Sequence, residues 1–346
     1  MGAHLMKLIS KFLKYHISKG VLLLPIALTV SVIYAESDAM SVLNHKPLFN
    51  LNIEAADARY FIYINGFVVH KEYHSHGQIS TTLPVNHWMH PSENVMAIAV
   101  FPEYDGTVRK SARLKVELQV HSEALAGPRH TIATLDFQQK YADEGGATKD
   151  SSPQGRYNSV NGFELSDDGD VWVSEISAHP VYDYEGAATY QRELKIPSAL
   201  PLWAFFGSDE LPDYDAMSDD DYYAVRDDLY KEYKHIESAL KRGDIDSVLP
   251  LFSERSSEID TAFYLEPGTT QQTLRRSMER IHSSNEHDLL ELRPDNVIIT
   301  LEENRKLVSL TRGAEGAAIV YNLKGGGSEG FHLIFRKQDG EWILTR

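Results

Sequence analysis

Five histidines lie within 21 residues of one another, between positions 70 and 90. Imidazole is the commonest protein ligand of zinc and copper, and two residues spaced as His74 and His76 share one face of a strand. The sequence has no cysteine and no H-E-x-x-H motif, and the spacing matches no closed tetrahedral site. The group therefore has two interpretations, a metal site or solvated histidines at strand ends. Its members are His70, His74, His76, His87 and His90.

No motif for another kind of catalytic chemistry is found in the sequence. The nucleophile elbow G-x-S-x-G is absent, and a chain without cysteine has no thiol nucleophile. The glycines at 325–327 are not followed by the lysine and the helix that a phosphate-binding loop needs. We therefore expect a non-enzymatic protein, and we assign no catalytic residue and no cofactor.

An acidic, tyrosine-rich stretch is the main candidate for binding a partner. Residues 209–221 contain seven carboxylates, and Tyr214, Tyr222 and Tyr223 lie in or beside them. Opposite charge speeds the encounter of two proteins, while tyrosine and tryptophan dominate the contacts that hold a complex together. Trp203, just upstream in PSALPLWAFF, is either an exposed anchor or an apolar plug between two domains. The predicted partner-binding residues are Trp203, Asp209, Glu210, Asp213, Tyr214 and Asp215.

The charge of the chain narrows the choice of partners. The net charge is −16, and removal of the first 35 residues, which hold four lysines and no acidic residue, would make it −20. A surface this acidic repels nucleic acid and anionic lipid headgroups, and it attracts basic proteins. We therefore expect no nucleic-acid partner and a basic protein partner.

The first 35 residues have the pattern of a secretory signal peptide. Four lysines precede the uncharged run VLLLPIALTVSVIYA, which ends at Ala35, a small residue suited to cleavage. The run is shorter than the roughly 20 residues of a spanning helix and contains Pro25. We predict cleavage near Ala35, a periplasmic mature protein and no membrane span after cleavage; an uncleaved anchor is the alternative.

Residues 36–207 are predicted to form an antiparallel β-sandwich. Strand patterns at 61–64 and 67–70 flank Asn65-Gly66, a dipeptide that suits the type I′ turn of a hairpin. This hairpin and the later LPVNHWMHPSENVMAIAV resemble the jelly-roll accessory domains of glycoside hydrolases, although Ser92 stands where that family usually has glycine. The resemblance implies the sandwich fold without assigning a sugar ligand. Further strands are predicted at 78–83, 95–101, 112–120, 131–137, 170–176 and 189–196.

Residues 208–218 are predicted to be an acidic linker, and residues 219–346 an α+β domain. Apolar residues from Tyr222 to Leu240 recur at helical spacing, with an S-x-x-D start at Ser218 and a stop at Gly243. Helices at 245–252 and 271–282 and then a run of strands complete the pattern. The strands are predicted at 296–301, 306–311, 316–323, 330–337 and 341–345.

This order of elements, together with the closing FHLIFRKQDGEWILTR, resembles the nuclear-transport-factor-like, cystatin-related cone. The resemblance implies three helices folded against a curved sheet that encloses a pocket. Enzymes of that family place an Asp–His or similar pair in the pocket, for which Asp288 and His332 are the candidates here; an ordinary strand histidine is the alternative for His332. The predicted fold class is thus multidomain, an antiparallel β-sandwich followed by an α+β cone.

Export, acidity and the lack of a catalytic motif together favour a binding protein. The whole chain resembles the immunity proteins of contact-dependent and type VI secretion systems, which implies a periplasmic inhibitor that covers the active site of a basic secreted toxin. A carbohydrate- or small-ligand-binding protein of the envelope is one alternative, and exposed aromatics on a sheet face would favour it. A cone-type hydrolase or isomerase is the other, and it needs two ionisable residues facing an apolar pocket.

Overall fold

The computed structural model describes most of the chain from residue 46 onward. The predicted signal peptide lies outside the described residues, as do His74, His76, Tyr214 and Asp215, so those predictions remain untested. The described ranges are 46–73, 77–103, 105–121, 129–142, 148–149, 156–158, 162–164, 171–180, 187–213, 217–302, 304–313 and 316–346.

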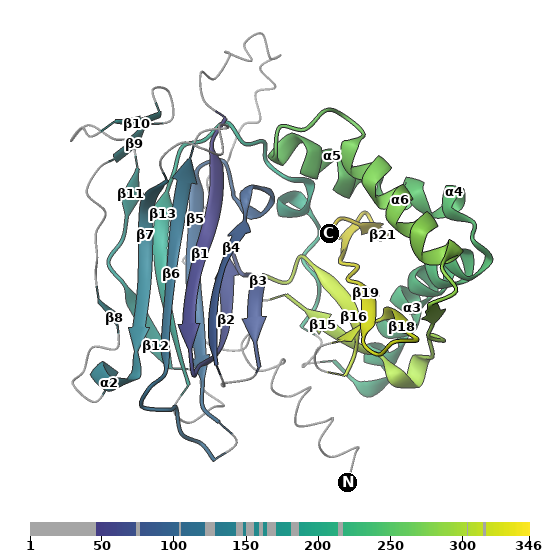
Figure 1. Ribbon diagram of the computed structural model, residues 1–346, viewed down its shortest axis with the longest axis horizontal. Coiled ribbons are helices and arrows are strands. Elements are labelled where there is room, and N and C mark those ends of the chain that lie inside the picture. The colour runs from purple at the N-terminus through teal and green to yellow at the C-terminus, as the bar shows by residue number, and fades with distance from the viewer. Residues whose placement is uncertain are drawn as a thin grey trace.

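Two antiparallel sheets form the N-terminal part and share one apolar core (Figure 1). Alternation along the strands sends one side of each sheet into this core, as Phe49, Leu51 and Ile53 of β1 illustrate by being fully buried. The first sheet has the order β4-β1-β6-β7-β8 and consists of β1 (Leu48–Ala56), β4 (Gln78–Pro84), β6 (Arg113–His121), β7 (His130–Gln138) and β8 (Thr148–Lys149).

The second sheet has the order β11-β13-β5-β2-β3, and β12 also pairs with β13. Its edge strand β3 lies next to the C-terminal part (Figure 1). The strands are β2 (Arg59–Ile64), β3 (Phe67–Glu72), β5 (Glu93–Phe101), β11 (Trp172–Val173), β12 (Ser177–Pro180) and β13 (Ala188–Lys195). Other elements of this part are η1 (Asn86–Trp88), α2 (Gln139–Ala142), β9 (Arg156–Asn158), β10 (Gly162–Glu164) and η2 (Ala204–Gly207).

The predicted Asn-Gly hairpin is confirmed. Asn65 and Gly66 have φ angles of 55° and 77° and connect β2 to β3. Positive φ at both central residues gives the turn the twist of the flanking strands. The side chain of Asn65 also accepts a hydrogen bond from Val95 N (2.8 Å), which fixes the turn to β5.

Helices dominate the first half of the C-terminal part. The predicted long helix is α3 (Asp219–Arg242), capped by Ser218, whose Oγ accepts a hydrogen bond from Asp221 N, and ended by Gly243 with φ 71°. Leu229 and Tyr233, on the predicted stripe, are fully buried. The other helices are α4 (Ile245–Val248), η3 (Leu249–Phe252), α5 (Ser253–Ala262) and α6 (Thr269–Ser283).

Two small antiparallel sheets follow, and the helices cover one side of them (Figure 1). Ile299 and Leu310 belong to the core that this side shares with α3, whereas their neighbours Thr300 and Ser309 lie on the opposite side. One sheet consists of β14 (His287–Leu289), β18 (Ile319–Leu323) and β19 (Ser328–Phe331). The other consists of β15 (Ile298–Leu301), β16 (Val308–Arg312), β17 (Gly316–Ala317), β20 (Phe335–Gln338) and β21 (Glu341–Leu344), and η4 (Pro294–Asn296) precedes it.

The structure thus contains mostly antiparallel sheets with a few helices, as expected for a β-rich part and an α+β part. Several elements differ from the sequence prediction. Strands β1 and β14 and helix α5 were not predicted, and the strand expected at 170–176 is only two residues long in β11. The strand expected at 330–337 is divided between β19 and β20. The relation to the nuclear-transport-factor-like cone stays a prediction.

Buried polar groups join the two parts of the chain. Asn86 is fully buried; its Oδ1 accepts from Phe49 N (2.6 Å), and its Nδ2 donates to Pro47 O (2.9 Å) and to Ala262 O of α5 (2.7 Å). Leu307, from the C-terminal part, belongs to the core of the two large sheets. The two parts therefore share a packed junction.

Candidate functional site

The structure corrects one predicted partner-binding residue. Trp203 is 2 % exposed and donates its Nε1–H to Asn86 O (3.1 Å), within the core of the two large sheets. A side chain buried there offers no surface to a partner. Of the two interpretations of Trp203, the structure therefore supports the apolar plug.

The described part of the predicted linker is held against the C-terminal part. Asp209 N donates to Lys337 O (2.9 Å) and Leu211 N to Arg305 O (2.7 Å), while Leu211 is 1 % exposed. The side chains of Asp209 and Glu210 remain exposed, and Glu210 forms an ion pair with Arg305. Asp213, by contrast, is partly buried.

The first turns of α3 carry the most acidic exposed surface near this linker. Asp219, Asp220 and Asp221 are exposed, and Tyr223 beside them is 49 % exposed. The guanidinium of Arg226 stacks on the Tyr223 ring at 4.7 Å and pairs with Asp227. Carboxylates at a helix start are stabilised by the helix dipole. Tyr222 faces inward as predicted, because its hydroxyl accepts from Ile299 N (3.2 Å).

The three described histidines of the cluster lie in different surroundings. His70, on β3, contacts the ring of Tyr60 at 5.8 Å, and its Nε2 is buried without a hydrogen-bond partner. His90 accepts from the backbone N–H groups of Ser92 and Glu93 through Nδ1 (3.2 Å each) and packs against Phe206. Within the described residues, neither ring is hydrogen-bonded to a carboxylate in the way that second-shell groups orient metal ligands.

His87 is poorly suited to hold a cation. Burial, together with the nearby guanidinium groups of Arg346 and Arg255, lowers the pKa of its imidazole to about 3. A fixed positive charge beside the ring disfavours any second cation there. Among the residues that the structure describes, no group of three or more His, Asp or Glu side chains is placed to hold a metal ion.

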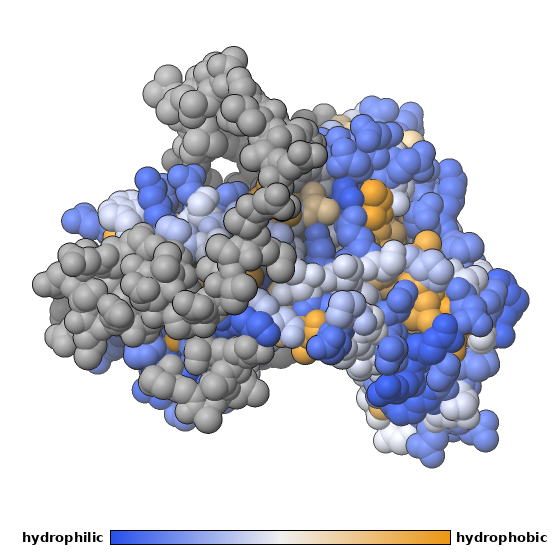
Figure 2. Space-filling view, turned by 90° about the horizontal axis from the view of Figure 1, so that it is seen from above, coloured by the Kyte–Doolittle hydropathy of each residue, from blue (hydrophilic) through white to orange (hydrophobic). Residues whose placement is uncertain are grey.

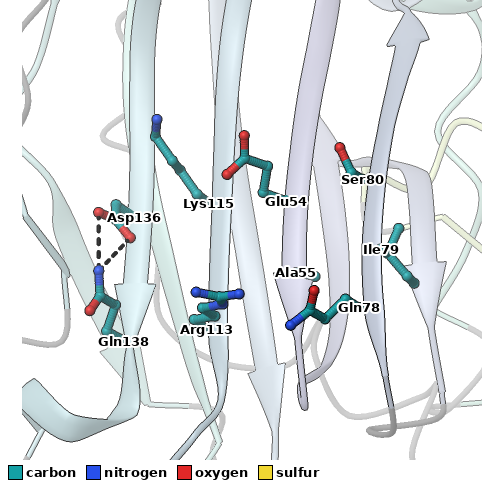
Figure 3. A pocket seen from close by; sticks show the side chains of 9 residues that line it. All are labelled: Glu54, Ala55, Gln78, Ile79, Ser80, Arg113, Lys115, Asp136 and Gln138. Atoms are coloured by element: carbon teal, nitrogen blue, oxygen red, sulfur yellow. Dashed lines mark hydrogen bonds between the residues drawn. The ribbon is translucent and has the colours of Figure 1, made fainter.

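One groove lies on the outer side of the first large sheet. Figure 3 shows side chains of β1, β4, β6 and β7 along its floor, among them Glu54, Ser80, Lys115 and Asp136. Its volume is about 500 Å³, and Lys115 is paired with Glu117 at 2.7 Å. No aromatic side chain lines it. The aromatic sheet face that would favour a carbohydrate-binding surface is therefore missing from this groove.

A second cleft lies at the junction of the two parts, and the sequence analysis missed it. It has a volume of about 390 Å³ and lies between β3 on one side and β15, β16 and residues 332–334 on the other. The only sequence signal is the polar side of the paired strands β15 and β16. The residues that line the cleft are Val68, Val69, His70, Lys71, Thr300, Glu302, Ser309, Leu310, Thr311, His332, Leu333 and Ile334.

Three ionisable groups of this cleft, Glu302, His70 and His332, are shifted toward their neutral forms. Burial raises the pKa of Glu302, although the Val68 N–H that it accepts (3.0 Å) and the charge of Lys71 act in the opposite direction. Burial lowers the pKa of His70 and of His332, and Lys71 lowers that of His332 further. The cleft can therefore offer hydrogen-bond donors and acceptors beside the single ammonium group of Lys71 among its described residues.

The Asp–His pair suggested by the cone resemblance does not come together in one cavity. His332 lines the junction cleft, whereas Asp288 is exposed on β14 and is not part of its lining. Asp288 pairs in register with Asn322 of β18. The structure therefore does not bring these two residues together in the junction cleft.

None of the helices in the described part of the chain combines the length and the apolar character that crossing a bilayer requires. No family model, no curated protein and no solved structure matches the chain. Its function must therefore be argued from its own surfaces.

Proposed function

We propose that this chain is an exported, non-enzymatic binding protein that neutralises a basic secreted toxin, in the manner of an immunity protein. The observation that carries the proposal is the exposed Tyr223 among the carboxylates that begin α3. We call Asp209, Glu210, Asp219, Asp220, Asp221 and Tyr223 the acidic surface.

Two features support a protein partner for this surface. Arg305 pairs with Glu210 and Arg226 pairs with Asp227, whereas Asp219, Asp220 and Asp221 form no ion pair within the described residues. Their negative charge is therefore not neutralised by such a pair. The field of these carboxylates accelerates encounter with a basic protein, and an exposed tyrosine supplies contact area at little entropic cost. Seen from above, the C-terminal part is mostly hydrophilic with small separate hydrophobic patches (Figure 2).

A glycan-binding function is the second candidate, and the outer groove of the first sheet is what favours it. Its floor combines carboxylate, amide, hydroxyl and ammonium groups from four neighbouring strands (Figure 3). The missing aromatic platform makes it the weaker candidate, because sugar rings commonly stack on such side chains. Retention of glycans alone by the protein would favour this function over toxin neutralisation.

Reversing charges on the acidic surface is expected to slow association with the partner. In the variant Asp219→Lys/Asp220→Lys, we expect the association rate at low salt to fall about tenfold and its salt dependence to weaken, with a smaller change in dissociation. The measurement is stopped-flow or surface-plasmon kinetics on a basic effector captured from the producing organism.

The matched control is Glu286→Lys/Asp288→Lys, which makes the same charge change at two exposed positions near β14. It should leave the association rate nearly unchanged. Equal slowing by both variants would mean that only net charge matters, and no slowing by the first would place the site elsewhere.

The export part of the proposal predicts a mature N-terminus at or near Glu36. Cleavage by signal peptidase leaves a small residue, here Ala35, at the end of the removed segment. Intact-mass measurement on protein from the periplasmic fraction tests this. A chain that retains Met1 and sediments with membranes would instead support the uncleaved anchor.

A further inference from the structure

We propose that the junction cleft between β3 and the strands β15 and β16 binds a small uncharged polyhydroxylated molecule, of the size of a mono- or disaccharide. This site is separate from the acidic surface, and the proposal does not depend on the neutralisation of a toxin.

The position and size of the cleft fit a ligand site. Pockets for small molecules commonly measure about 300–1,000 Å³ and form preferentially where two domains meet. This cleft measures about 390 Å³, and both parts of the chain supply its walls. The junction around it is tied together by Val68 N to Glu302 (3.0 Å) and Asn304 Nδ2 to Asn65 O (3.2 Å), so the walls are held in place.

One wall is a sheet face of closely spaced hydroxyl and carboxyl groups. Thr300 and Ser309 are direct cross-strand partners, and Glu302, just beyond the end of β15, lines the same cleft. Thr311 lies diagonally from Thr300, with 2.9 Å between the two Oγ1 atoms. Adjacent hydroxyls on a flat strand pair can be matched by the adjacent hydroxyls of a sugar ring.

Part of the hydrogen-bonding capacity of this wall is unused within the described residues. Ser309 Oγ and the imidazole of His332 form no hydrogen bond there, and only one carboxyl oxygen of Glu302 does, to Val68 N. A hydroxyl and a neutral imidazole each both donate and accept, and the free carboxyl oxygen of Glu302 can accept. A ligand hydroxyl also both donates and accepts, whereas an ion would engage only the donors or only the acceptors of this wall.

Charge also favours an uncharged ligand. Burial moves Glu302, His70 and His332 toward their neutral forms. Lys71 is the one lysine or arginine among the described residues that line the cleft, and its Nζ lies 5.4 Å from the centre of the Tyr73 ring. The remaining wall is aliphatic, formed by Val68, Val69, Leu333 and Ile334, and suits the C–H groups of a sugar ring.

The test is calorimetric titration of the full chain with glucose, maltose and myo-inositol as uncharged probes, and with acetate and phosphate as anions. We expect saturable binding of at least one polyol, with the imidazole NMR signals of His70 and His332 shifting in parallel. The variant Thr300→Val/Ser309→Ala keeps the shape of the wall, removes two hydroxyls and should weaken binding by about tenfold or more.

Ser80→Ala, in the outer groove, is the matched control and should leave the affinity unchanged. Three results would overturn the proposal. The first is that none of the three polyols binds saturably. The second is that only anions bind, and that Lys71→Met weakens their binding. The third is that Ser80→Ala weakens polyol binding but the double variant does not. Circular dichroism of each variant establishes that it is folded before it is titrated.

Discussion

Replacement of Arg346 by methionine is expected to destabilise the protein by about 3 kcal/mol, because it leaves the largely buried carboxylate of Glu258 without its cation. Arg346 is 5 % exposed, and its guanidinium pairs with Glu258 (2.5 Å), donates to His87 O (2.8 Å) and stacks over the ring of Phe205 at 4.3 Å. It thus connects α5 with the core of the N-terminal part. Equilibrium urea unfolding measures the loss.

The ion pair between Arg305 and Glu210 provides the control. It also joins two segments at the junction, but the Glu210 side chain is 64 % exposed. Arg305→Met should therefore cost less than about 1 kcal/mol. Adding Glu258→Gln to Arg346→Met should recover part of the stability, since it removes the unpaired charge. If the two arginine variants lost equal amounts of unfolding free energy, burial of the ion pair would not explain the effect of Arg346→Met.

The elements that the sequence predicted well have a strong local pattern. Helix α3 has a buried stripe, a serine cap and a terminal glycine, and all three features occur as expected. The hairpin of β2 and β3 is fixed by Asn65-Gly66. In both cases residues a few positions apart determine the local structure.

Helix α5 illustrates why other elements were missed. Its inward side carries few apolar residues, and Ser256 and Asp260 are among its buried side chains. Glu254 on this helix pairs with Arg336, 82 residues later in the chain. Glu258 pairs with Arg346, 88 residues later. A helix held by distant charges has no apolar period, so hydrophobic periodicity could not find it.

The candidate sites depended on tertiary contacts to an even greater degree. Trp203 is a typical hot-spot residue by type, and only its packing in the core removes it from the surface. The junction cleft joins His70 with His332, residues from opposite ends of the described chain. No spacing rule links residues so far apart; only the packing of the two parts does.

His87 is expected to make the stability of the protein strongly dependent on pH. The folded-state pKa of its imidazole is about 3, below the ordinary value of 6.5, because the ring is desolvated and lies near Arg346 and Arg255. Between these two values the unfolded chain binds more protons than the folded one. The stability from this group is therefore fully present above about pH 6.5 and is lost as the pH falls toward 3.

Replacing His87 by phenylalanine tests this, since the ring contacts with Trp88 (5.1 Å) and Phe263 (5.4 Å) can be kept while the titration is removed. Between pH 7 and pH 5 the wild-type protein should lose about 2 kcal/mol through this residue. The variant should not show that loss. Between pH 7 and pH 5, its unfolding free energy should therefore rise relative to that of the wild type by the same amount.

The matched substitution is His235→Phe, at an exposed position of α3. It should leave the change in unfolding free energy between pH 7 and pH 5 almost as in the wild type. A smaller change in His87→Phe would then be due to the buried imidazole at the junction. If both variants flatten the profile equally, the shift is a general effect of removing a histidine. If neither does, water reaches the imidazole of His87 in solution, and burial does not lower its pKa as the structure indicates.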